Sequence, residues 1–81
     1  MTEIEATELI KKIINRMLEE KGLDPVVLEK GTMLLGGGIS IDSLDLAVVL
    51  TEMEAKAEKD PFKSGFINFQ TVLELAKLYA D

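Results

Sequence analysis

Apolar residues recur at intervals of three and four positions in three segments of the chain. That spacing places them on one face of an α-helix, and no segment sustains the alternation of apolar and polar residues that a strand needs. The first segment opens with Thr2 and Glu5, which have the spacing of a capping box, and ends before Gly22, a residue suited to a helix C-cap. The sequence therefore predicts an all-α fold, whose first helix presents Ala6, Ile10, Ile13, Ile14, Met17 and Leu18.

A second helix is predicted from Ser43 to about Lys59. Asp42 is its expected N-cap, and Asp45 lies in its first turn, where a negative charge suits the helix dipole. The segment between Gly22 and Asp42 must then be a long connection, which would let two long helices run parallel. Three apolar residues are expected to anchor that connection to the core: Met33, Leu34 and Leu35.

A last helix is predicted after Asn68, its expected N-cap, with Ile67 and Val72 spaced as a hydrophobic staple. Before it, Asp60 and Pro61 predict a turn or a short third helix. The expected fold is thus a small four-helix bundle, with three longer helices, a short third helix and a long loop between helices one and two. The last helix should place one broad apolar face on the core: Phe69, Val72, Leu73, Ala76 and Tyr79.

The composition argues against several classes of function. The 81 residues suffice for one domain, residues 1–81, and include neither histidine nor cysteine. The commonest general base, metal ligand and thiol nucleophile are missing, so we expect a non-catalytic protein without a metal. A net charge of −6 disfavours nucleic acid and anionic membranes and favours basic protein partners. The N-terminal residues lack the pattern of a signal peptide, so we expect a cytoplasmic protein, which we take to be a monomer.

The second helix carries apolar residues on two sides. One side is the expected core stripe: Leu46, Val49, Leu50, Met53 and Ala57. The other side, flanked by carboxylates, is a candidate docking face: Leu44, Asp45, Ala47, Val48, Thr51, Glu52, Glu54 and Ala55. Either the helix sits centrally and is covered on both sides, or the second face binds a basic, partly apolar groove on another protein. No lysine or arginine occurs between Lys30 and Lys56, so the acidic field there is uninterrupted.

Two features lie at or just before the start of this helix. The run GGG at residues 36–38 lacks the spacing and the lysine of a phosphate-binding P-loop, which favours a flexible connector. Ser43 lies between Asp42 and Leu44-Asp45, and a serine at a helix start is in most proteins only a capping element. Neither feature indicates a function by its residue type alone.

The runs IDSLDLAVVL (residues 41–50) and TVLELAKLY (residues 71–79) resemble the acyl carrier protein family, whose hallmark is Asp-Ser-Leu at the start of the second helix. The resemblance spans most of the chain and implies a bundle of acyl-carrier type. It also implies that a phosphopantetheinyl transferase joins 4′-phosphopantetheine from coenzyme A to Ser43 through a phosphodiester. The thiol of that arm would carry acyl groups as thioesters, for fatty acid, polyketide or related synthesis, and would need no histidine or cysteine of the chain itself.

By the same resemblance, Asp42, Leu44 and Asp45 belong to the surface that the transferase and the acyl-loading and acyl-processing enzymes bind with basic surfaces. Many members of the family carry a glutamate where this chain has Val48, and the segment DPFKSGF is a poor match to the family's acidic third helix. Both departures favour a specialised carrier. Two alternatives remain open: a peptidyl or aminoacyl carrier, and an unmodified helical adaptor in which Ser43 only caps the helix.

Overall fold

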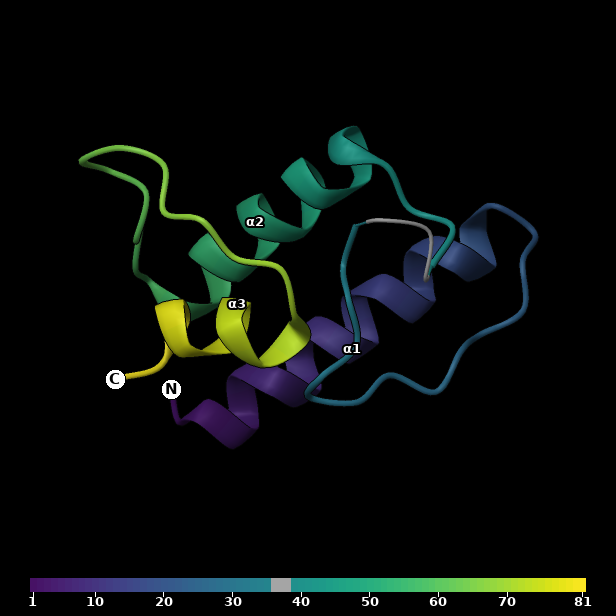
Figure 1. The fold of residues 1–81 in the computed structure, drawn as a ribbon, viewed down its shortest axis with the longest axis horizontal. Helices are drawn as coiled ribbons and strands as arrows, with labels where there is room; N and C mark the ends of the chain where they lie inside the picture. The colour runs from purple at the N-terminus through teal and green to yellow at the C-terminus, as the bar shows by residue number, and fades with distance from the viewer. Residues whose placement is uncertain (36–38) are drawn as a thin grey trace.

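The computed structural model describes residues 1–35 and 39–81, and its regular elements are three helices: α1 (Glu3–Glu20), α2 (Ser43–Ala57) and α3 (Val72–Tyr79). The prediction of an all-α fold is confirmed. Within the described ranges no strand forms, and Met33 and Thr71 make an isolated antiparallel bridge. The glycine run 36–38, expected to be a connector, lies outside the described residues. Figure 1 shows α1 and α2 as the two long helices, with the shorter α3 packed beside them.

The first two helices begin where the sequence places them. At α1 the Glu5 N–H donates to Thr2 Oγ1 at 3.1 Å, and the Thr2 N–H donates to Glu5 Oε1 at 2.9 Å. This reciprocal pair is the predicted capping box, and it satisfies backbone N–H groups that have no partner inside the helix. Lys21 is the C-cap of α1, and Gly22 follows it with a φ of 78°, the left-handed conformation that glycine adopts without a Cβ clash.

The last helix begins later than predicted, because its N-cap is Thr71 and not Asn68. Glu74 N–H donates to Thr71 Oγ1 at 3.1 Å, and Thr71 N–H donates back to Glu74 Oε1 at 3.0 Å. The residues just before α3 pair instead with the long connection, since the Leu34 N–H donates to the Gln70 carbonyl at 2.8 Å. That pairing holds residues 66–70 outside the helix.

The predicted short third helix is absent, and residues 61–64 form turns. Two i→i+3 hydrogen bonds close them, from Lys63 N–H to the Asp60 carbonyl at 3.3 Å and from Gly65 N–H to the Phe62 carbonyl at 3.1 Å. Gly65 has a φ of 136°, which is incompatible with continuing a helix. The fold of the described residues is therefore a three-helix arrangement and not a four-helix bundle.

The core lies where α1 faces both α2 and α3. The connection between α1 and α2 adds Leu34, which is 1% exposed, whereas Met33 and Leu35 are 43% and 44% exposed. The prediction that all three anchor the connection is thus wrong for two of them, because successive side chains of an extended segment point to opposite sides. Tyr79 of α3 is buried, and its hydroxyl donates to the Leu50 carbonyl of α2 at 3.3 Å. Burial raises the pKa of Tyr79 to about 12.

Candidate functional site

Ser43 is exposed and is the first residue of α2. The helix begins there because Asp42 caps it: the Asp45 N–H donates to Asp42 Oδ1 at 2.9 Å, and the Asp42 N–H donates to Asp45 Oδ2 at 3.1 Å. The two aspartates thus cap the helix together and leave the serine between them without a capping role. Asp42 was the predicted N-cap, and this prediction is confirmed.

The lysine that caps the C-terminus of α1 completes this end of the site. The Lys21 ammonium forms an ion pair with the Asp45 carboxylate and donates to the Ser40 carbonyl at 3.2 Å. The hydrogen bond from Lys21, followed by that from the Asp42 N–H, lowers the pKa of Asp45. The C-terminal end of α1 therefore contacts the first turn of α2 through this ion pair, close to Ser43 in the sequence. Sequence reasoning missed Lys21, because nothing local links residues 24 positions apart.

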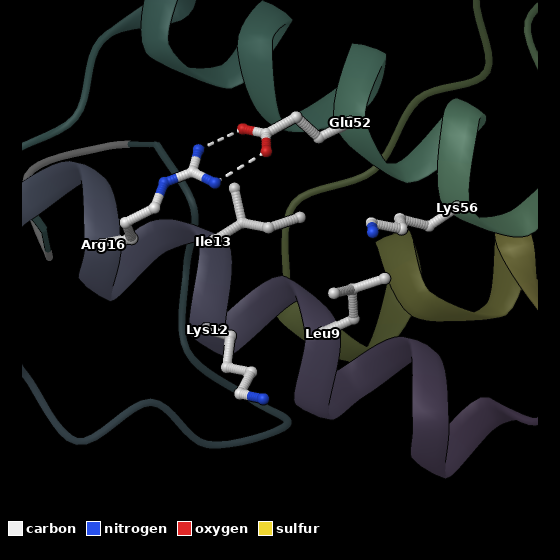
Figure 2. Close-up of a pocket in the computed structure, with 6 residues that line it drawn as sticks. All are labelled: Leu9, Lys12, Ile13, Arg16, Glu52 and Lys56. Carbon is white, nitrogen blue, oxygen red and sulfur yellow. Dashed lines mark hydrogen bonds and ion pairs between the residues drawn. The ribbon is translucent and has the colours of Figure 1, made fainter.

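Glu52 faces α1 as well, as Figure 2 shows. Its carboxylate accepts two hydrogen bonds from the Arg16 guanidinium, with an Nη1–Oε1 distance of 2.8 Å, and Arg16 also pairs with Glu20 at 3.1 Å. The hydrogen bonding with Arg16 lowers the pKa of Glu52. Two of the carboxylates predicted to dock partners, Asp45 and Glu52, thus already have cationic partners inside the chain.

The remaining predicted docking residues lie on the exposed side of α2, which we call the outer face: Leu44, Ala47, Val48, Thr51, Glu54 and Ala55. Leu44 is 77% exposed and Val48 is 46% exposed, although both are large and apolar. Leu46, Val49 and Met53 are buried on the other side of the helix, as predicted. The residues that the structure describes therefore cover only one side of α2, and among them the interpretation in which both sides are covered does not hold. Asp42 is exposed next to the outer face.

An aromatic group that the sequence reasoning did not single out follows α2. The Phe62 and Phe66 rings stack with centroids 5.6 Å apart, and Phe69 lies 5.9 Å from each of them. Phe66 is 74% exposed, whereas Phe69 is buried. Of the three phenylalanines within these eight residues, the sequence analysis placed Phe69 on the apolar face of the last helix, whereas Phe69 lies before α3 and packs against Phe62 and Phe66.

Among residues 1–35 and 39–81, no cluster of three potential metal-ligating side chains occurs. None of the helices in that part of the chain is long and apolar enough to span a bilayer. Comparison of the chain with family models, with curated proteins and with solved structures gave no match.

Proposed function

We propose that the protein is an acyl carrier that holds 4′-phosphopantetheine on the Ser43 oxygen. The observation that carries the proposal is an exposed serine, freed from capping, at the start of α2 within the run Asp42-Ser43-Leu44-Asp45. A phosphopantetheinyl transferase would supply the arm from coenzyme A. The Ser43 oxygen would displace adenosine 3′,5′-bisphosphate from the phosphorus that bears pantetheine, and its proton would pass to a base of the transferase.

The surroundings of Ser43 fit a phosphodiester in two respects. The N-terminus of a 15-residue helix offers backbone N–H groups and the positive end of the dipole to an anion. The carboxylates of Asp42 and Asp45 oppose that charge, but the Lys21 ammonium offsets one of them. Exposure of the hydroxyl supports access by a transferase, and a thiol at the end of the arm would carry acyl groups without help from any side chain of this protein.

The outer face of α2 is the proposed docking surface for the transferase and for the acyl-loading and acyl-processing enzymes. Its exposed Leu44 and Val48 would supply apolar contact, while Asp42 and Glu54 would meet basic groups of the partner. Because Asp45 and Glu52 are engaged by α1, fewer carboxylates are free there than the sequence suggests. This weaker acidic character, and the turns that replace a third helix, favour a specialised fatty acid, polyketide or related pathway. We place the protein in the cytoplasm as a monomer.

The test is incubation of the purified chain with coenzyme A and a broad-specificity phosphopantetheinyl transferase, followed by intact mass measurement. Wild type is expected to gain one phosphopantetheine. Ser43→Ala should gain none, and the matched variant Ser40→Ala, which removes an exposed hydroxyl three residues away, should gain one as wild type does. Absence of the gain in wild type, under conditions that modify a known carrier, would reject the proposal.

A second candidate is an unmodified helical adaptor, which the exposed apolar outer face of α2 favours independently of Ser43. It predicts tight binding to one partner that Ser43→Ala leaves unchanged and that Leu44→Ser and Val48→Ser weaken. A peptidyl or aminoacyl carrier would accept the same arm but would be loaded by an adenylating enzyme. Loading assays on the modified protein, with acyl-transferring and with adenylating enzymes, separate that case from the acyl carrier.

A further inference from the structure

A groove of about 300 Å³ lies between α1 and α2, beside the Arg16–Glu52 pair. Figure 2 shows the residues that line it: Leu9, Lys12, Ile13, Arg16, Glu52 and Lys56. Its floor is apolar, because Ile13 is only 4% exposed and belongs to the core, and Leu9 packs against that core while remaining half-buried. A ligand in the groove would therefore contact the hydrophobic core directly.

The lining of the groove is cationic, in a chain whose net charge is −6. Lys12, Arg16 and Lys56 contribute three positive charges and Glu52 one negative charge, which leaves +2. The Glu52 carboxylate is already bound on both oxygens by Arg16. Neither Lys12 nor Lys56 forms an ion pair with any residue that the structure describes.

The two free ammonium groups are not equivalent. In Figure 2 the Lys56 side chain extends from α2 toward the space between the two helices, whereas the Lys12 side chain runs away from the ion pair. Beyond Lys12 the surface becomes acidic, since Glu5 and Glu8 line the adjoining hollow with Leu9 and Lys12. An anionic group in the groove is therefore best placed beside Lys56, because Glu52, the carboxylate among the residues that line the groove, is neutralised by Arg16.

We infer that this groove binds a single-chain anionic amphiphile, with its alkyl chain over Leu9 and Ile13 and its anionic head beside Lys56. The volume is at the lower end of the range of about 300–1,000 Å³ that small-molecule sites occupy, which fits one short chain and no larger group. A neutral amphiphile would lack the contact with Lys56, and a cationic one would be repelled. The inference does not involve Ser43 and stands independently of the proposed function.

The test is a titration of the unmodified, ¹⁵N-labelled protein with octanoate below the concentration at which it forms micelles, followed by backbone amide chemical shifts. Saturable shifts are expected at residues 9–16 and 52–56. Each methylene added from hexanoate to octanoate should tighten binding by about two- to fourfold, because it buries more apolar surface in the groove. Octanol and octylammonium, which have the same chain, should bind more weakly than octanoate.

Two variants test how much the charge of Lys56 contributes to octanoate binding. Lys56→Gln should weaken octanoate binding by about three- to fivefold at low salt, as loss of one partly exposed ion pair predicts. The matched variant Lys77→Gln, which removes an exposed lysine near the end of α3, should leave binding unchanged. Leu9→Gln should weaken octanoate binding because it removes apolar contact from the floor of the groove. Should Leu9→Gln unfold, Lys56→Glu, which reverses the charge beside the anionic head and should weaken octanoate binding, keeps the test valid. Shifts confined to residues 62–69, which carry the aromatic group, would overturn the inference, and so would a lack of saturation or equal binding of octanol and octanoate.

Discussion

The Arg16 guanidinium on α1 holds the Glu52 carboxylate on α2 through two parallel hydrogen bonds, with an Nη1–Oε1 distance of 2.8 Å. The pair is partly exposed, with side-chain exposures of 49% for Arg16 and 30% for Glu52. Solvent and salt therefore reduce its strength, but its bidentate geometry fixes how the two helices approach each other. It also occupies one carboxylate of α2 with a cationic partner inside the chain.

The first prediction concerns this pair. Arg16→Lys should lower the free energy of unfolding almost as much as Arg16→Gln does, because an ammonium cannot reproduce the two parallel hydrogen bonds. A double-mutant cycle of Arg16→Gln and Glu52→Gln, measured by denaturant unfolding, should give a favourable coupling that shrinks as salt increases. Strictly additive effects at low salt would show that the two side chains do not interact.

The second prediction concerns acid stability. The pKa values of Asp45 and Glu52 are lowered by their cationic partners, so both groups stabilise the fold above their ordinary pKa values of 3.8 and 4.5. That contribution is lost as the pH falls through the lowered values, where the folded carboxylates take up protons. In Lys21→Gln, the free energy of unfolding should therefore fall less steeply as the pH is lowered below about 4. Lys77→Gln is the control, and an identical flattening in both variants would contradict the assignment.

The third prediction concerns alkaline stability. Burial raises the pKa of Tyr79 to about 12 from its ordinary value of 10.0, so the folded chain favours the neutral phenol. The resulting stability is complete below pH 10 and is lost as the pH rises toward 12, because the unfolded chain ionises first. Tyr79→Phe should remove this alkaline loss and should cost about 1 kcal/mol at neutral pH through the hydrogen bond to the Leu50 carbonyl. An alkaline branch that stays unchanged in Tyr79→Phe would refute the assignment.

The fourth prediction concerns the docking surface and rests on the proposed function. Glu54→Lys should slow modification and acyl loading, mainly at low salt, because Glu54 is an exposed carboxylate on the outer face of α2. Glu19→Lys makes the same charge change on the exposed surface of α1 and should have a smaller effect. Val48→Glu should raise the rate at which generic synthase enzymes act on the modified protein. Equal rates for Val48→Glu and wild type with every such enzyme would show that Val48 does not set partner choice.

The sequence predicted those features that depend on neighbouring residues. The capping box of Thr2 and Glu5 and the N-cap at Asp42 involve residues no more than three positions apart, so these patterns are local and the starts of the first two helices followed from them. The buried stripe of α2 followed from helical spacing in the same way. The predicted start of α3 at Asn68 was wrong, although Thr71 and Glu74 show the same local capping pattern. The competing start at Asn68 is excluded by the pairing of residues 32–34 with residues 70–72, a contact between distant segments that the local sequence does not show.

The candidate site was predicted in part for the same reason. The position of Ser43 at the start of α2 followed from Asp42 and the apolar run, and the outer face followed from the spacing of Leu44 and Val48. The sequence did not show that two of the carboxylates are occupied inside the chain. Lys21 and Arg16 reach Asp45 and Glu52 only once α1 packs against α2. Tertiary contacts of this kind decide which acidic groups remain free for a partner.

The central claim is that one exposed hydroxyl at the head of α2 carries a prosthetic arm. Tandem mass spectrometry of the chain after reaction with coenzyme A and a phosphopantetheinyl transferase tests it most directly. We predict a single phosphopantetheine per chain, located on Ser43 and on neither Ser40 nor Ser64. An arm attached at either of those two serines, or a chain left unmodified alongside a fully modified control carrier, would contradict the account.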